Sequence, residues 1–221
     1  MRELSGIISG IAPSATLEIS DKARQMQRQG IDVISLSIGE PDFDTPAHIK
    51  EACIQALTRG ETHYAPSNGI PELLSAISRK TEQENKITCT SGQVIVTCGA
   101  KNAIYDAMVA VLNPGDEVII LDPSWVSYEP CVRMAGGKPV HHLLNSKTFQ
   151  VDESILDKIT GKTRMIVINS PSNPSGAILN RSSLGLIADM CEDYDLWLRI
   201  AARYPMGSAV VGPANPRNLP S

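Results

Sequence analysis

Short apolar runs rich in β-branched residues recur along the chain, and their length and composition are typical of buried strands. The sequence predicts strands at Val94–Cys98, Val118–Leu121, about Val140–Leu144 and Met165–Ile168. Each run is far shorter than the ~20 consecutive apolar residues that a membrane-spanning helix needs.

Segments with apolar residues on one helical face lie before and between these runs. The predicted helices begin at Thr45-Pro46 (N-cap and first residue), at Pro71, after Gly99, at Asp152 (N-cap, through Ile159) and after the loop Asn169–Gly176 (through about Cys191). Strand–helix–strand alternation with short loops indicates an α/β fold. We therefore expect a three-layer, mostly parallel sheet with helices on both faces.

Composition narrows the class of protein. The 221 residues are 42% hydrophobic and 20% charged, which suits a globular chain with a packed core, and the net charge of −4 argues against a nucleic-acid-binding or anionic-membrane surface. Five cysteines without a CxxC pair favour a reduced, cytoplasmic protein whose thiols pack as small apolar groups. The four histidines have no metal-ligand spacing, so no metal site is predicted.

The turn Gly99-Ala100-Lys101 joins a predicted strand to a predicted helix. Free N–H groups at a helix N-terminus favour a phosphate or carboxylate, although a glycine at such a turn often serves packing alone. The chain has neither a GxGxxG fingerprint nor a GxxxxGK[ST] P-loop.

Two further candidates follow strand ends, where open α/β sheets bind ligands. Two prolines restrict the loop around Asn173, whose carboxamide could donate to a ligand or, as the pattern alone favours, cap the turn. Trp125 follows Asp122-Pro123-Ser124 and could stack on a flat ring or simply pack at the surface.

Taken together and in order, these segments resemble a known family. Leu36–Phe43 (LSIGEPDF), Tyr64–Gly69 (YAPSNG), Gly99–Lys101, Trp125 and Asn173–Gly176 (NPSG) are similar to motifs of the fold-type-I aminotransferases that use pyridoxal 5′-phosphate. The likeness is strongest to the class I/II, aspartate-aminotransferase-like branch and runs from about residue 5 to residue 197. It implies an incomplete cofactor-binding large domain, about half of which is absent, preceded by an N-terminal arm and small-domain segment.

The resemblance implies a role for each matching residue. Ala100 and Lys101, after Gly99, would hold the cofactor phosphate mainly through backbone groups, Trp125 would stack on the pyridine ring, and Asn173 would donate to the ring's phenolic oxygen. Ser175 stands where the family usually has threonine.

The same resemblance implies a substrate site and a dimer. Gly39 would offer its backbone N–H to the substrate carboxylate, close to Trp125 and Asn173. Tyr64 would reach the cofactor phosphate of the neighbouring subunit in a homodimer. The implied reaction moves an amino group between an amino acid, aspartate or a related one, and a 2-oxo acid.

The likeness ends near Trp197. The family's Asp-x-x-Tyr motif, the lysine that bonds to the cofactor and two functional arginines have no counterpart, and all nine lysines lie at or before Lys162. Three arginines, four prolines and no acidic residue follow Leu198. We expect an N-terminal arm and small-domain segment (1–45), an incomplete large domain (46–197) and an aberrant proline-rich tail (198–221), produced by a frameshift or truncation.

A chain without the lysine has no catalytic residue of its own, so we predict no transaminase activity, marginal stability and aggregation. Two alternatives stay open from the sequence: another fold-type-I enzyme such as a C–S lyase, and a non-catalytic fragment that keeps weak phosphate binding.

Overall fold

The computed structural model describes residues 5–37, 39, 41–193 and 197–198. The chain divides into two compact units, one made of residues 1–11 with 68–221 and the other of residues 12–67. The predicted domain boundary after residue 45 stays a prediction, and the predicted proline-rich tail lies, apart from Leu198, outside the described residues.

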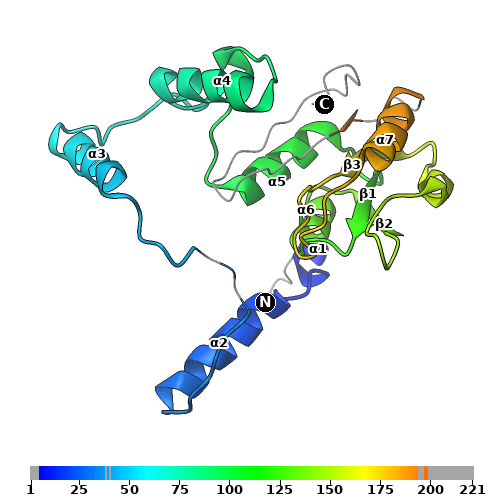
Figure 1. Cartoon of the computed structure of the whole chain (residues 1–221), viewed down its shortest axis with the longest axis horizontal. Coiled ribbons are helices and arrows are strands. Elements are labelled where there is room, and N and C mark those ends of the chain that lie inside the picture. The colour runs from blue at the N-terminus through cyan, green and yellow to red at the C-terminus, as the bar shows by residue number, and fades with distance from the viewer. Residues whose placement is uncertain (1–4, 38, 40, 194–196, 199–221) are drawn as a thin grey trace. The chain divides into compact units, whose positions relative to one another are not determined.

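A parallel sheet forms the centre of the larger unit (Figure 1). Its strands are β1 (Glu117–Asp122), β2 (Lys138–Leu143), β3 (Thr163–Val167) and β4 (Trp197–Leu198), in the order β2-β1-β3-β4. Every pair is parallel, and in the β1–β2 register Glu117 lies opposite Lys138 and Ile120 opposite His141. Three of the four predicted strands and the parallel arrangement are thus confirmed.

Alternate side chains of the strands point to opposite faces of the sheet and pack into two separate hydrophobic cores. On one face Val118 and Ile120 pack with α5 (Ala100–Val111) and α6 (Tyr128–Met134). On the other face Ile119 and Leu121 pack with η2 (Glu153–Lys158) and α7 (Arg181–Asp193). Figure 1 shows α5 and α6 on one side of the strands and α7 on the other, so the expected three-layer α/β fold is confirmed.

The remaining elements of this unit precede the sheet. They are α1 (Gly6–Ser9), α4 (Pro71–Asn85) and η1 (Ser91–Gln93). Helix α4 begins at Pro71 as predicted, and it buries Leu74 and Thr81.

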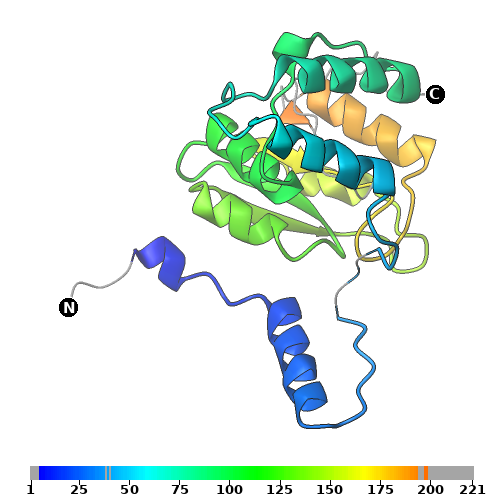
Figure 2. The ribbon, with the colours of Figure 1, turned by 90° about the vertical axis from the view of Figure 1, so that its left-hand side faces the viewer.

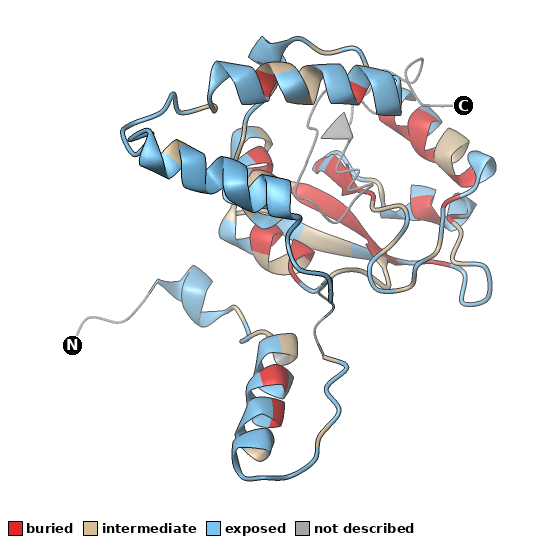
Figure 3. Cartoon of the chain, turned by 60° about the vertical axis from the view of Figure 1, so that its left-hand side comes forward, coloured by how far each residue is buried: buried red, intermediate tan, exposed pale blue. Residues whose placement is uncertain are grey.

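Residues 12–67 hold α2 (Ala15–Arg28) and α3 (Ala47–Thr58), joined by a long irregular connection (Figure 2). Helix α3 starts after Pro46, which is the N-cap and not the first helical residue as predicted. No residue of α3 is buried, and Figure 3 shows it almost entirely in the colour of exposed residues. The described helices include none long and apolar enough to cross a membrane.

Three further sequence predictions need correction. Val94–Cys98 is extended but forms no strand within the described part of the chain: Val94 and Val96 donate backbone hydrogen bonds to Ser91 (3.3 Å) and Asn68 (2.9 Å), neither of which lies in a strand, and the Ile95 side chain is 70% exposed. Asp152 caps a helix as predicted, but the helix is a 3₁₀ helix. Cys131 and Cys191 are buried as expected, whereas Cys53 and Cys98 are exposed.

Candidate functional site

The turn into α5 has the geometry of an anion-binding helix N-terminus. Gly99 adopts φ +92°, a conformation that other residues rarely adopt, and nothing lies within 4 Å of where its Cβ would be. The first helical hydrogen bonds run from Asn102 and Ala103 to the Gly99 carbonyl oxygen (3.2 and 3.3 Å). The N–H groups of Ala100 and Lys101 precede them and have no partner within the helix. The turn therefore offers two donors at the positive end of a 12-residue helix.

Trp125 lies in the loop after β1 and is half-buried. Its ring meets Tyr128 edge to face, with centroids 5.5 Å apart, and packs at the margin of the α5–α6 core. The Lys101 ammonium nitrogen lies over the indole, 5.2 Å from the ring centroid. The structure thus brings together two predicted site residues from different elements, while the packing role considered for Trp125 also holds.

Backbone groups close the loop that carries Asn173. Ser172 donates to Ala177 (2.8 Å) and Gly176 donates to Ser172 (2.7 Å). In the amide orientation that satisfies both of its groups, Asn169 donates to the Pro171 carbonyl oxygen and accepts from the Asn173 N–H (3.1 and 3.0 Å).

The Asn173 side chain is exposed, and its carboxamide makes no hydrogen bond to any described residue. The expectation that it caps the turn was therefore wrong, because Asn169 has that role. The Asn173 carboxamide keeps its hydrogen-bonding capacity for a ligand.

A small hollow lies between the loop that follows β1 and the loop that follows β3. It is lined by Ser124, Tyr128, Asn169, Asn173 and apolar neighbours, with a volume of about 10 Å³. That is about the space of one water molecule, whereas small-molecule pockets hold roughly 300 Å³ or more. A ligand would therefore sit over this open edge of the sheet and not inside the hollow.

Burial and one cation set the protonation of the groups beneath this edge. Burial raises the pKa of Tyr128, and its hydrogen bond with Asn169 opposes that rise. Burial also raises the pKa of the Cys131 thiol, against the opposing effect of Lys101. Both groups are therefore uncharged near neutral pH, which leaves Lys101 and the α5 N-terminus as the attraction for an anion.

Gly39 and Tyr64 belong to the unit of residues 12–67, where both are exposed. Their implied roles stay predictions.

Sequence reasoning missed Tyr128 and Asn169, which support Trp125 and Asn173. An aromatic residue three positions after Trp125, at the start of a helix, was the available signal for Tyr128. Asn169 had none beyond its place at the end of a strand.

The chain matches a known family over most of its length. The family model for aminotransferase class I and II matches residues 31–200. This chain belongs to that family. Among curated class I/II aminotransferases, the aspartate/prephenate aminotransferase of Thermus thermophilus is 44% identical over 200 residues, covering 90% of this chain and 52% of the relative. The aspartate aminotransferase of Bacillus subtilis is 41% identical over 196 residues, covering 88% and 50%.

Solved aminotransferase structures have the same fold. Thermus thermophilus aspartate aminotransferase with maleate superposes with a TM-score of 0.87 at 43% identity, covering 91% of this chain and 53% of that one. The Thermotoga maritima aspartate aminotransferase gives 0.84 at 38%, covering 90% and 53%. The chain thus spans about half the length of the class I/II aminotransferases that it matches.

Proposed function

We propose that this chain carries the cofactor-binding half of a pyridoxal-phosphate-dependent aminotransferase. The observation that carries the proposal is the convergence of the α5 N-terminus, Trp125 and the free Asn173 carboxamide at the carboxyl-terminal edge of the sheet, in a chain of this family. The reaction would move an amino group between an amino acid, aspartate or a related one, and a 2-oxo acid.

The residues present fit the cofactor. The open Gly99 turn lets a phosphate approach the backbone, and the N–H groups of Ala100 and Lys101 would hold it there. Trp125 offers an aromatic face beside that turn, and Asn173 an unused amide donor. When bound, pyridoxal phosphate supplies an aldehyde that accepts the amino group and a pyridine ring that withdraws electrons.

These residues would bind and orient; the described contacts give none of them the position of a proton carrier. The Lys101 ammonium faces the indole and would add positive charge next to the phosphate. Tyr128, held uncharged by burial, supports Trp125 from the side. Gly39 would bind the substrate carboxylate through its N–H, together with Trp125 and Asn173.

The proposal extends to a homodimer and a compartment. Tyr64, a fully exposed side chain, would reach the phosphate bound by a neighbouring subunit. Five free cysteines suit the reducing cytoplasm, where we place the protein.

Binding of pyridoxine 5′-phosphate to the full chain tests the proposal. This probe has the ring and the phosphate of the cofactor but no aldehyde, so it cannot react with surface lysines. Ala100→Pro removes one N–H donor at a position where helices tolerate proline. We expect it to weaken binding, measured by calorimetry, by about ten-fold or more, the usual effect of losing a hydrogen bond to a charged group.

Ala47→Pro is the matched control, since Ala47 is the first residue of α3. It should leave the affinity unchanged. Unphosphorylated pyridoxine should bind at least ten-fold more weakly than the phosphate ester. Equal affinity for both ligands, or no loss with Ala100→Pro, would contradict phosphate binding at α5.

A further inference from the structure

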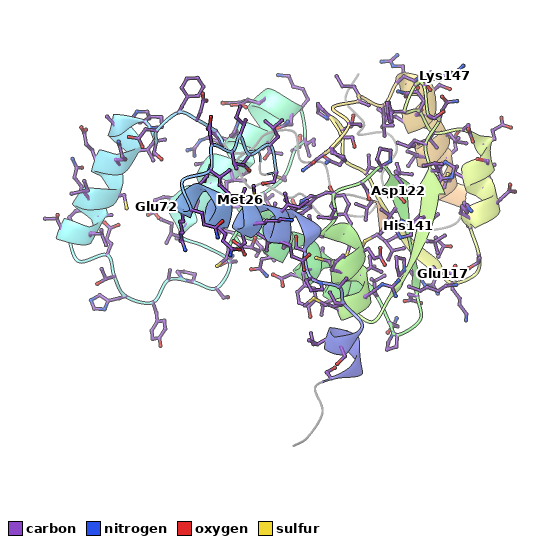
Figure 4. The ribbon with its side chains drawn as sticks, turned by 90° about the horizontal axis from the view of Figure 1, so that it is seen from below. Met26, Glu72, Glu117, Asp122, His141 and Lys147 are labelled. Carbon is purple, nitrogen blue, oxygen red and sulfur yellow. The ribbon has the colours of Figure 1, made fainter. Side chains whose placement is uncertain are left out.

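A chain of polar contacts ties the edge strand β2 to the loop that carries Trp125. The Ser124 hydroxyl donates to Asp122 Oδ1 (2.7 Å), and His141 Nδ1 lies 2.7 Å from Asp122 Oδ2. Asp122 is the last residue of β1, and His141 is on β2, in the part of the sheet labelled in Figure 4. The Asp122 carboxylate therefore links His141 to the residue next to Trp125.

A second carboxylate faces the same imidazole. His141 Nε2 lies 3.5 Å from Glu129 Oε2, and Glu129 Oε1 is 2.8 Å from an Arg133 guanidinium nitrogen. Both charged residues are on α6, which starts at Tyr128. Among the described residues, Asp122 on β1 and Glu129 with Arg133 on α6 are the charged groups that face His141.

The protonation state of His141 decides how many of these contacts it can make. A neutral imidazole has a single N–H, whereas the imidazolium has two. Only the charged ring can donate to Asp122 and Glu129 together, and so join β1, β2 and α6 at one point. The neutral ring turns a lone pair toward one of the carboxylates.

We propose that His141 is a positioning residue for Trp125, acting through Asp122 and Ser124 and engaged most firmly when its imidazole is protonated. The inference rests on the proposed function, in which Trp125 faces the pyridine ring. Loop 123–127 has no other side chain hydrogen-bonded to β1 or β2 among the described residues, so loss of this link gives Trp125 more freedom.

Nuclear magnetic resonance of the full chain tests the link without any ligand. The chain has two tryptophans, and Trp125→Phe assigns their indole N–H signals. Between about pH 5 and pH 8, the range in which histidine changes charge, the Trp125 signal should shift with the same midpoint as the His141 ring signals. His141→Gln should remove that shift, while His63→Gln, a change at an exposed histidine of the other unit, should preserve it.

Asp122→Asn provides a second variant, because it keeps an acceptor for Ser124 but removes the carboxylate that His141 contacts. It should reduce the pH-dependent shift of Trp125 without unfolding the chain. A Trp125 shift unchanged in both His141→Gln and Asp122→Asn would overturn the inference.

Ligand binding then separates this inference from the proposed function. At a pH where His141 is protonated, pyridoxine 5′-phosphate should bind the wild-type chain about two- to five-fold more tightly than it binds His141→Gln, and the two chains should bind it equally where His141 is neutral. Because the probe's phosphate also changes charge in this pH range, the two chains are compared at the same pH. A ratio of the two affinities that does not change with pH would overturn the positioning role. If the probe does not bind at either pH while Trp125 still follows His141, the proposed function fails and the positioning of a cofactor fails with it.

Discussion

Each end of the sheet carries a polar residue, but the two differ in burial and in hydrogen bonding. At the amino-terminal end Glu117 is buried, and its carboxylate accepts from Lys138 (2.9 Å) and from the Thr160 hydroxyl (2.6 Å). At the carboxyl-terminal end Asn173 is exposed, and its carboxamide has no partner among the described residues. Polar groups with every partner supplied by the protein stabilise the fold, whereas groups with spare capacity are available to a ligand.

This contrast gives each end its own experimental signature. Changes at the amino-terminal end should lower the free energy of unfolding and leave ligand affinity unchanged. Changes at the carboxyl-terminal end should lower ligand affinity and leave the free energy of unfolding nearly unchanged.

The largest effect is expected at Glu117. Glu117→Ala leaves Thr160 and Lys138 without their shared acceptor and should lower the free energy of unfolding by about 2–3 kcal/mol, measured by urea denaturation. Asn173→Ala is the contrasting variant and should change it by less than about 0.5 kcal/mol. Equal losses in the two variants would remove the distinction between the ends.

The acid sensitivity of Glu117 has a defined sign. The hydrogen bond from Thr160 and the contact with Lys138 lower its pKa from the ordinary 4.5. Its contribution is therefore fully present above pH 4.5 and is lost as the pH falls through the lowered pKa.

Gly137, directly before β2, should have the next largest effect. A Cβ there would lie 3.0 Å from Leu112 Cδ1, 3.1 Å from Val132 Cγ1 and 3.3 Å from the Asp116 carbonyl oxygen. Gly137→Ala should therefore destabilise the chain by about 2 kcal/mol, read from the thermal midpoint. Gly161→Ala, where nothing lies within 4 Å, is the control, and a similar loss there would refute the steric explanation.

The carboxyl-terminal end is probed by Trp125. Trp125→Ala should weaken pyridoxine 5′-phosphate binding by about ten-fold, because it removes the aromatic face beside Lys101. Trp125→Phe should retain most of the affinity. Calorimetry measures both, and an alanine variant that binds like wild type would exclude stacking at this position.

The smallest effect on stability is expected at a buried histidine of β2. His142 on β2 is 2% exposed, its Nε2 has no hydrogen-bond partner within the described residues, and burial lowers its pKa from 6.5, with Lys158 adding to and Asp152 opposing the shift.

The unfolded state therefore binds a proton more readily than the folded state, and stability should decline as the pH falls below 6.5, by at most about 1.4 kcal/mol per pH unit. His142→Leu, compared with wild type by urea denaturation from pH 7 to about pH 5, should lack this part of the slope. Parallel stability profiles would contradict it.

The sequence predicted the elements that depend on local signals and missed those that depend on tertiary contacts. The strands β1 and β3 and the helices α4, α5 and α7 were predictable because apolar periodicity, prolines and polar stops are local signals. Val94–Cys98 is at least as rich in β-branched residues as β1 but forms no strand, since a strand also needs a paired neighbour that composition does not supply.

The candidate site likewise has parts that local signals predict and parts that they do not. Trp125 and Asn173 follow the ends of β1 and β3, which a parallel sheet brings to one edge, so their neighbourhood was predictable. Gly99–Lys101 instead follows a predicted strand that does not form in the described part of the chain. The pairing of His141 with Asp122 was not, because it depends on the register of β2 against β1 and on the rotation of both side chains.

The most direct test maps pyridoxine 5′-phosphate onto the backbone amides of the full chain by nuclear magnetic resonance. The largest shifts should fall on Ala100, Lys101 and the residues flanking Trp125 and Asn173, with none at the amino-terminal end. Shifts that centre on Glu117 and Lys138, or that spread evenly over the surface, would contradict the assignment of ligand binding to the carboxyl-terminal edge.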